Sequence, residues 1–482
     1  MNKTIHCYLP YGEEAQVKAT VNALKASPAV IKITLLSTDA AAAAVEGCDI
    51  LGIDSLTSSA TMRAIAEHTV ADYILLYTKY NTLEPGYQAL ERFIKIAGDS
   101  GAGMLYADCY TIIEGKKSNA PAIDYQEGAL RDDFNFGSVL FFNTADFKKA
   151  AAGINKDFKA AGLYDLRLRL SRIAPIVHIN EYLYSDVTLD NRKSGEKIFD
   201  YVDPKNRGVQ LEMEEACTDP LKAIGAYLEP EFDTIEFNAG DFANEASVII
   251  PVRNRKRTIA DAVKSALGQK TDFPYNVIVI DNHSTDGTTE ILAELAKNES
   301  RLIHLVPERD DLGIGGCWNL GVANPECGKF AVQLDSDDVY ADENTLAKIV
   351  KAFYEQNCGM VVGTYMLTDI NLQMLPPGLI DHKEWTPENG RNNALRINGL
   401  GAPRAFYTPM LREIKVPNTS YGEDYALGLA FSRHNQIGRI YDVLYFCRRW
   451  EDNSDAALDI NKMNANNLYK DRIRTWEVQA RK

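Results

Sequence analysis

VIVIDNHSTDGT, residues 277–288, joins a short apolar strand to an acidic residue and a polar turn. Four apolar residues precede Asp281, and the Asn, Ser, Asp and Gly residues after it favour a tight turn. In open α/β sheets such turns lie at the carboxyl edge, where ligands bind. Taken alone, the pattern favours a turn without a ligand. A hydrogen bond from a nucleobase to Asp281 is the alternative.

Strands and helices alternate on both sides of this stretch. Residues 247–251 and 330–334 have the apolar character of buried strands. Residues 258–267 and 343–356 carry apolar side chains at helical spacing. The alternation predicts an α/β fold with a mostly parallel sheet.

The first half of the chain repeats this order. Gly103-Met104 and Gly359-Met360 each open a strand, at an offset of 359 − 103 = 256 residues. The pattern Y-x-L-x-L-x-x-S-R occurs at 164–172 and again at 425–433, at an offset of 432 − 171 = 261. Two nearly equal offsets predict two copies of one domain. We expect them at residues 1–232 and 246–482, with a linker at 233–245 rich in Pro, Gly, Asn and acidic residues.

Three acidic residues lie close together after the strand at 330–334. Asp335, Asp337 and Asp338 repel one another unless a cation or solvent separates them. Mg²⁺ or Mn²⁺, completed by substrate phosphates, suits such a site. The alternative is a helix N-terminus, where acidic residues favour the helix dipole.

A second acidic pair, Glu423-Asp424, begins a predicted helix. A positioned carboxylate can take the proton of an acceptor hydroxyl, although first-turn acids on a helix have the same pattern. Arg449 and Trp450 follow in the stretch CRRW at 447–450. Cations there would stabilise a leaving diphosphate, whereas a solvated arginine pair is the alternative.

Taken in order, six stretches resemble the family 2 glycosyltransferases of the GT-A fold. They are ASVIIPVRNR (246–255), VIVIDNHSTDGT (277–288), GIGGCWNLG (313–321), VQLDSDD (332–338), YGEDYALG (421–428) and CRRW (447–450). Each stretch is weakly specific, and the ordered set is specific. The resemblance covers about 210 residues, and it implies two tandem GT-A α/β/α domains when combined with the duplication.

The resemblance also implies roles for particular residues on the donor side. Pro251, Arg253 and Asn254 would contact the nucleotide, Asp281 the base, and Gly315 and Asn319 the nucleoside. Asp335 and Asp337 match the D-x-D pair that holds Mg²⁺ or Mn²⁺, with Asp337 the more direct ligand.

On the acceptor side, Asp424 matches the catalytic base of an inverting transfer, with Glu423 beside it. Arg449 and Trp450 match the end of a Q-x-x-R-W pattern, but Phe446 stands where that pattern has Gln. This departure argues against a processive polysaccharide synthase.

The first copy lacks these acidic residues. In the repeat alignment Lys79 stands opposite Asp337, and Gly162-Leu163 stands opposite Glu423-Asp424. We therefore expect a degenerate, non-catalytic GT-A-like domain that recognises acceptor or supports the second domain. Binding of a phosphate by Lys79 is a further alternative. Arg167 and Arg169 are expected to be solvated.

The charge, the length of the apolar runs and the cysteine pattern argue against several classes of protein. The 482 residues carry a formal charge of −15, which argues against nucleic-acid binding. The longest apolar runs are far below the roughly 18 residues that span a bilayer. The eight cysteines contain no C-x-x-C pair, so reduced thiols in the cytoplasm are expected. The locally basic tail at 461–482 is expected to pack as a helix; contact with the inner face of a membrane is the alternative.

The sequence thus predicts an inverting glycosyltransferase that uses a nucleotide-diphosphate sugar, with UDP favoured by the resemblance. The acceptor is expected to be a glycan or lipid-linked hydroxyl in surface polysaccharide synthesis. The alternatives are a nucleotidyltransferase, which shares metal carboxylates on an α/β fold, and a pseudo-enzyme that only binds nucleotide sugar or glycan.

Overall fold

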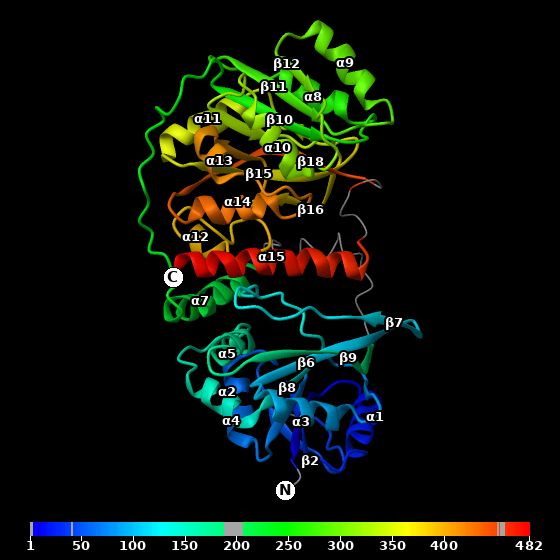
Figure 1. Cartoon of the computed structure of the whole chain (residues 1–482). Helices are drawn as coiled ribbons and strands as arrows, with labels where there is room; N and C mark the ends of the chain where they lie inside the picture. Colours follow the sequence, from blue (N-terminus) through cyan, green and yellow to red (C-terminus); the bar gives the residue numbers. More distant parts are fainter. Residues whose placement is uncertain (1–2, 40–41, 188–205, 451–452, 454–457) are drawn as a thin grey trace.

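The computed structural model describes residues 3–39, 42–187, 206–450, 453 and 458–482. Figure 1 shows two α/β lobes stacked end to end, with helices between them. The first sheet has the order β3-β2-β1-β4-β8-β6-β9-β5, with β7 paired to β6. Its strands are β1 (Ile5–Pro10), β2 (Val30–Ser37), β3 (Asp49–Gly52), β4 (Tyr73–Tyr77), β5 (Leu83–Pro85), β6 (Met104–Ile113), β7 (Lys116–Ala120), β8 (Val139–Asn143) and β9 (Ile176–Val187). The helices of this half are α1 (Glu14–Lys25), α2 (Ser59–His68), α3 (Ala89–Ser100), α4 (Thr144–Ala152), α5 (Gly162–Leu170) and α7 (Arg207–Ala223).

The second sheet repeats this topology, with the order β12-β11-β10-β13-β17-β15-β18-β14 and β16 paired to β15. Its strands are β10 (Ala246–Val252), β11 (Tyr275–Asp281), β12 (Leu302–Leu305), β13 (Phe330–Gln333), β14 (Val339–Tyr340), β15 (Met360–Asp369), β16 (Met374–Ile380), β17 (Arg404–Tyr407) and β18 (Ile437–Arg449). The helices are α8 (Ile259–Leu267), α9 (Thr288–Asn298), α10 (Ile314–Ala323), α11 (Thr345–Gln356), α12 (Gly390–Asn393), α13 (Thr408–Ile414), α14 (Glu423–Ser432) and α15 (Ile460–Arg481).

The two sheets agree in strand order and in strand direction. In both, the first four strands of the order run parallel, and the next strand, β8 or β17, pairs antiparallel to its neighbours. The predicted duplication and the α/β fold class are therefore confirmed, with each sheet mixed rather than wholly parallel.

Burial explains why these segments form the central strands. Every residue of β1, β4 and β11 is buried, as expected for strands covered by helices on both faces. The amphipathic helix α8 turns Ile259, Ala262 and Val263 to the second sheet and ends at Leu267, with Gly268 as its C-cap. These packed layers fix where each strand ends, and hence where the polar turns after the strands lie.

Two long helices, α7 and α15, lie between the lobes (Figure 1). One continuous hydrophobic cluster joins side chains of both lobes, for example Tyr164 and Leu168 of α5 with Trp385, Tyr425 of α14 and Ile473 of α15. The prediction that the tail packs as a helix is confirmed, and its apolar Ile473 is 6% exposed. The lobes share a core instead of meeting only at polar surfaces.

The lobes also make reciprocal contacts through equivalent loops. The sequence Ala-Leu-Arg occurs at 129–131 and at 394–396, at an offset of 396 − 131 = 265. Arg131 donates from Nε to Asp471 of α15 at 3.1 Å, and Arg396 donates from Nη1 to Gln210 of α7 at 2.8 Å. Each loop arginine thus reaches the closing helix of the other copy.

Some expectations need correction. Arg167 is not solvated: it is 4% exposed and donates to the carbonyl oxygens of Ala129 and Arg131. Arg169 is only partly exposed and pairs with Asp165 at 2.8 Å. The eight cysteines are unpaired. Within the described ranges, no helix is both long and apolar enough to cross a bilayer.

Candidate active site

A cleft of about 200 Å³ opens at the carboxyl edge of the second sheet. Both predicted acidic pairs line it: Asp335 and Asp337 follow β13, and Glu423 and Asp424 begin α14. Pro251 of β10 lines it as well. The other lining residues are Arg255, Ile314, Trp318, Gln333, Ser336, Arg404, Phe406, Val416 and Leu427. Acidic residues almost 90 positions apart in the sequence therefore meet in one cleft.

Asp335 is held in place by its neighbours on the sheet. Its backbone N–H donates to the Tyr445 hydroxyl at 3.0 Å, and Gln333 Nε2 donates to its carboxylate at 2.9 Å. Burial raises the pKa of Asp335 and the charge of Asp337 adds to this, although Arg404 and Gln333 act in the opposite direction. A cation beside the two carboxylates would relieve that repulsion.

Asp337 contacts donors from two segments. Trp450 Nε1 and Asn453 Nδ2 lie 3.4 and 3.3 Å from its Oδ2, and Arg255 Nε lies 3.6 Å away. Asp338, by contrast, is 4% exposed and accepts from the Arg448 backbone N–H at 2.7 Å. Of the three acidic residues, Asp335 and Asp337 face the cleft, and Asp338 joins the turn to β18.

The carboxylates of the cleft can be compared with the ligands that a divalent cation needs. In the part of the chain that the structure describes, no group of three or more His, Cys, Asp or Glu side chains could hold a metal ion. Mg²⁺ is nevertheless often held by one or two carboxylates plus substrate phosphates and water. Asp335 and Asp337 fit that arrangement, and the raised pKa of Asp335 shows a carboxylate that a cation would stabilise.

Glu423 and Asp424 have opposite electrostatic surroundings. Burial disfavours the ionised form of Asp424, but Arg404 and Lys470 outweigh it, so the pKa of Asp424 is lowered. Burial and the charge of Asp424 raise the pKa of Glu423 to about 8. Glu423 Oε2 is buried and has no hydrogen-bond partner among the described residues. At neutral pH the pair therefore offers one carboxylate and one protonated carboxyl group.

Arg404 is the cation that connects the two acidic pairs. Its Nη1 lies 2.6 Å from Asp424 Oδ2, and its charge also acts on Asp335 and Glu423. The side chain is 18% exposed and lines the cleft. Sequence reasoning missed Arg404, because the stretch around it, GAPRAFY, carries no recognisable pattern. Arg255 was also missed, although it lies directly after the predicted Arg253 and Asn254.

Of the residues predicted to contact the nucleotide, Pro251 lines the cleft, whereas Arg253, Asn254 and Asp281 do not. Arg253 and Asn254 are exposed, and the Asn254 side chain accepts from the Thr285 N–H at 2.8 Å. Asp281 is fully buried, and its carboxylate accepts from the Ser284 N–H at 3.1 Å and the Thr289 hydroxyl at 2.5 Å. Burial opposes ionisation of Asp281, yet these hydrogen bonds lower its pKa. Asp281 holds the turn, and its contact with a base stays a prediction.

Gly315 and Asn319, predicted to lie near the nucleoside, connect α10 to the segment before α14. A Cβ at Gly315 would lie 1.8 Å from the Pro417 carbonyl oxygen. Asn319 donates to the Val416 oxygen at 2.7 Å and accepts from the Val416 N–H at 2.9 Å. Neither residue lines the cleft, so a nucleoside contact remains a prediction.

Arg448 at the end of β18, and Trp450 and Asn453 after it, lie beside Asp337. Arg448 is 3% exposed and pairs with Asp261 at 3.1 Å. Arg449 is half-buried, and the Trp450 ring lies 4.9 Å from the Arg257 guanidinium. Arg449 and Trp450 do not line the cleft, so their action on the diphosphate or acceptor is untested.

The corresponding place in the first copy has no carboxylate pair. The strand registers put Tyr73 and Phe330 at equivalent positions of the two sheets. Thr78 and Tyr80 are therefore equivalent to Asp335 and Asp337. This structural alignment differs by one position from the sequence alignment, which put Lys79 opposite Asp337. Lys79 instead pairs with Asp186 at 2.7 Å, which argues against the phosphate alternative.

The start of α5, the helix of this copy that is equivalent to α14, is also tightly packed against its surroundings. A Cβ at Gly162, the first residue of α5, would lie 2.1 Å from the Ser59 backbone nitrogen. The position equivalent to Glu423 therefore has no room for an acidic side chain. Both changes agree with the expected loss of chemistry in this copy.

A comparison with known protein families identifies the part of the chain that contains most of the cleft. The family described as Glycosyl transferase family 2 matches residues 247–407, which include β10, β11, β13 and the turn with Asp335 and Asp337. Residues 247–407 form a family 2 glycosyltransferase domain. The matched residues end before α14, so Glu423 and Asp424 join the cleft from outside the match.

Several relatives and solved structures resemble this chain. An uncharacterized glycosyltransferase of Rickettsia felis is 24% identical over 312 residues, which cover 60% of this chain and 48% of the relative. A putative teichuronic acid biosynthesis glycosyltransferase of Bacillus subtilis, TuaG, is 32% identical over 121 residues, 25% of this chain and 46% of that protein. The chain thus spans about half the length of these curated relatives.

Among solved structures, S. aureus TarS 1–349 in complex with UDP-GlcNAc is 22% identical, with a TM-score of 0.38, covering 49% of this chain and 72% of that one. The mannosyltransferase PcManGT of Pyrobaculum calidifontis in complex with GDP-Man and Mn²⁺ is 16% identical, with a TM-score of 0.33, covering 58% and 84%.

Proposed function

We propose that the C-terminal domain, residues 246–482, transfers a sugar with inversion from a nucleotide-diphosphate sugar to an acceptor hydroxyl. The observation that carries the proposal is that one cleft is lined both by Asp335 and Asp337 and by Glu423 and Asp424. A donor diphosphate beside the first pair would present its sugar to the second pair. The N-terminal domain, residues 1–232, is non-catalytic in this proposal.

Asp335 and Asp337 would hold Mg²⁺ or Mn²⁺ together with the donor phosphates. When bound, such a cation supplies Lewis-acid stabilisation of the leaving diphosphate. Arg255 lies in the same cleft, where its cation would add to the stabilisation of developing negative charge. Arg449 and Trp450 are proposed to act on the leaving diphosphate or the acceptor.

Asp424 is the proposed base. Its lowered pKa keeps the carboxylate ionised at neutral pH, so it can accept the proton of the acceptor hydroxyl while the oxygen attacks the anomeric carbon. Glu423, with its pKa raised to about 8, remains protonated and can donate a hydrogen bond inside the cleft. Attack from the side opposite the nucleotide gives inversion.

The partners in the proposal are a UDP-sugar donor and a glycan or lipid-linked acceptor of a surface polysaccharide. The choice of UDP rests on the sequence resemblance. The similarity to a putative teichuronic acid biosynthesis glycosyltransferase supports a surface glycan as the product. A cytoplasmic location is part of the proposal and agrees with eight unpaired cysteines.

The first test is thermal unfolding of the wild type and Asp337→Asn with UDP, GDP or dTDP, with and without Mn²⁺. A ligand at 100 times its dissociation constant adds about 2.7 kcal/mol to the stability of a folded state that alone binds it. We expect UDP to raise the midpoint of the wild type only with Mn²⁺, and Asp337→Asn to abolish the shift. Stabilisation by no nucleotide would favour the glycan-binding pseudo-enzyme.

Product analysis then separates the enzyme classes. With a UDP-sugar and acceptor, UDP and a product of inverted anomeric configuration are expected. Retention of configuration would contradict the role of Asp424. Pyrophosphate released from a nucleoside triphosphate would instead identify a nucleotidyltransferase.

A further inference from the structure

The C-terminal helix α15 presents one face to the N-terminal lobe and another to α14. On the first face, the backbone N–H of Gly128 donates to the Thr475 hydroxyl at 3.0 Å, and Asn464 donates to the Pro121 oxygen at 2.7 Å. Arg131 completes this face through its ion pair with Asp471 at 3.1 Å. The contacted positions 464, 471 and 475 recur at helical spacing, so one side of α15 lies along residues 121–131.

The approach of the lobe to this face is close. A Cβ at Gly128 would lie 2.1 Å from the Thr475 backbone nitrogen. Arg131 is 3% exposed and Asp471 is fully buried. A buried ion pair holds its geometry only while both partners remain, because removal of one leaves an uncompensated buried charge.

The other face of α15 holds the first turn of α14. Arg474 is fully buried and donates from Nε to the Tyr425 hydroxyl at 2.8 Å. Lys470 lies over the Tyr421 and Tyr425 rings, at 4.7 and 5.3 Å from their centroids. Tyr425 directly follows Asp424, and its N–H donates to the Asp424 carboxylate at 2.8 Å.

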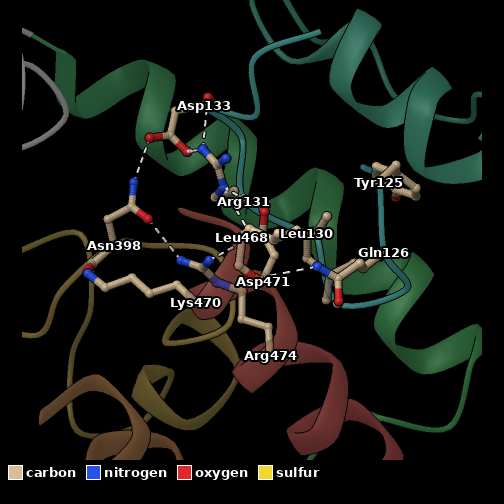
Figure 2. A network of polar contacts seen from close by, with 12 residues as sticks. Tyr125, Gln126, Leu130, Arg131, Asp133, Asn398, Leu468, Lys470, Asp471 and Arg474 are labelled. Atoms are coloured by element: carbon tan, nitrogen blue, oxygen red, sulfur yellow. Dashed lines mark hydrogen bonds and ion pairs between the residues drawn. The ribbon is translucent and has the colours of Figure 1, made fainter. Parts of the chain in front are cut away.

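Asp471 links the two faces. It accepts from Arg131 of the N-terminal lobe and, at 2.8 Å, from Arg474 of α15 itself. Asp133 of the lobe also binds Asn398, at 2.5 Å, and Asn398 in turn accepts from Arg474 at 2.9 Å. Figure 2 shows these groups converging around Arg474. The contacts form an unbroken path from the N-terminal lobe to the residue after Asp424.

We propose that the N-terminal domain serves as a positioning element for Asp424, with Arg131 as its positioning residue, acting through Asp471 and Arg474 on Tyr425. The proposal rests on the proposed function, because it assumes that Asp424 is the base. The N-terminal domain has lost its own acidic residues and keeps the segment that holds α15. Small displacements of a catalytic group lower the rate of a reaction whose partners must be aligned.

The test compares Arg131→Met with Arg131→Lys and with Lys482→Met in the full chain. Lys482→Met is the matched control. It also removes a cation from an ion pair between the C-terminal segment and the N-terminal lobe, but this pair, Lys482 with Glu127, is exposed. Amide hydrogen exchange of residues 423–432, kcat and the donor KM are measured for each. We expect faster exchange in α14 and a fall in kcat of about 10- to 100-fold for Arg131→Met. The donor KM should stay unchanged, Arg131→Lys should recover part of the rate, and the control should match the wild type.

The pH profile gives a readout that simple loss of folded protein would not change. The charged groups that face Asp424 are Arg404 from β17, Lys470 from α15 and Glu423 from its own helix. If α15 shifts, Lys470 acts less on Asp424, whose pKa then rises. The acid limb of kcat/KM should therefore move to higher pH in Arg131→Met and stay in place in Lys482→Met.

If Arg131→Met does not fold, Tyr425→Phe provides a second test of the proposal. Tyr425→Phe removes only the hydroxyl that Arg474 contacts, and a smaller change in the same direction is expected. Unchanged exchange in α14 together with unchanged kcat, in whichever variants fold, would overturn the proposal. A wild type that transfers no sugar would refute the proposed function instead, while the exchange of α14 would still decide whether Arg131 positions that helix.

Discussion

Glu423 and Asp424 are adjacent in the sequence but differ in charge at neutral pH. Asp424 is paired with Arg404, whereas burial and the Asp424 carboxylate keep Glu423 protonated. Raising the pKa of a carboxyl group from 4.5 to about 8 means that the folded state binds this proton more tightly than the unfolded chain. The proton on Glu423 is therefore linked to stability.

Substitution of Glu423 by Gln should show this linkage. The contribution of the wild-type carboxyl group to stability is complete below pH 4.5 and is lost as the pH rises through about 8, because the unfolded chain releases the proton first. Thermal midpoints measured without metal should show a gain for Glu423→Gln over the wild type that grows between these pH values. The same substitution at an exposed position of α2, Glu67→Gln, supplies the control for replacing a carboxyl group by an amide. A constant gain for Glu423→Gln would contradict the assigned protonation.

The sequence predicted the acidic residues of the site better than their partners. Asp335, Asp337 and Asp424 could be found because short polar stretches after apolar runs are local signals. Arg404 could not, because its role depends on β17 lying between β13 and β15, a contact between distant segments. Asn319 is predicted to contact the nucleoside, and its amide also pairs with the Val416 backbone. Side-chain amides satisfy backbone groups and ligands equally well, so sequence alone cannot separate the two roles.

At the scale of elements, α10 and the segment before α14 are in direct backbone contact. Gly315 lies on α10, and a Cβ there would approach the Pro417 oxygen to 1.8 Å. Gly315 itself is buried, and closely packed surroundings relax only partly around added atoms. The position of α14 thus depends on a glycine in a helix that carries no catalytic group.

Gly315→Ala should separate these elements. We expect a loss of about 1–3 kcal/mol in the free energy of unfolding, from overpacking, and a lower rate of sugar transfer. Gly98→Ala on α3 is the matched control, because its Cβ would meet nothing within 4 Å. The control should stabilise the protein by about 0.5–1 kcal/mol, since Ala is the better helix former. Denaturant unfolding of both variants provides the measurement, and equal effects at the two sites would refute the packing argument.

The repeat of elements was predictable, whereas the contact between the repeats was not. Apolar periodicity and the equal offsets signalled two similar sheets. Nothing local indicated that Arg167 would be buried under the loop with Arg131, or that Ile473 would join a core shared by both lobes. Helical spacing shows that a helix has an apolar face, but not which distant segment covers it.

For the whole molecule, the shared hydrophobic cluster predicts that both lobes unfold together. All four tryptophans, at 318, 385, 450 and 476, belong to the second half, so tryptophan fluorescence reports mainly on that half and on its contact with the N-terminal lobe. Far-ultraviolet circular dichroism reports both halves. Urea curves from the two probes should coincide, as for a single cooperative transition. A circular dichroism transition at a lower urea concentration than the fluorescence transition would show that the N-terminal lobe unfolds independently.

The reciprocal loops with Arg131 and Arg396 have a consequence for the history of the chain. Each copy touches the other through the same part of its own surface, as the subunits of a two-fold symmetric homodimer do. Duplication and fusion within one gene would convert such a dimer into this tandem chain. One fused copy could then lose its acidic residues under relaxed selection, while the old subunit contact continued to be selected because its partner still depended on it.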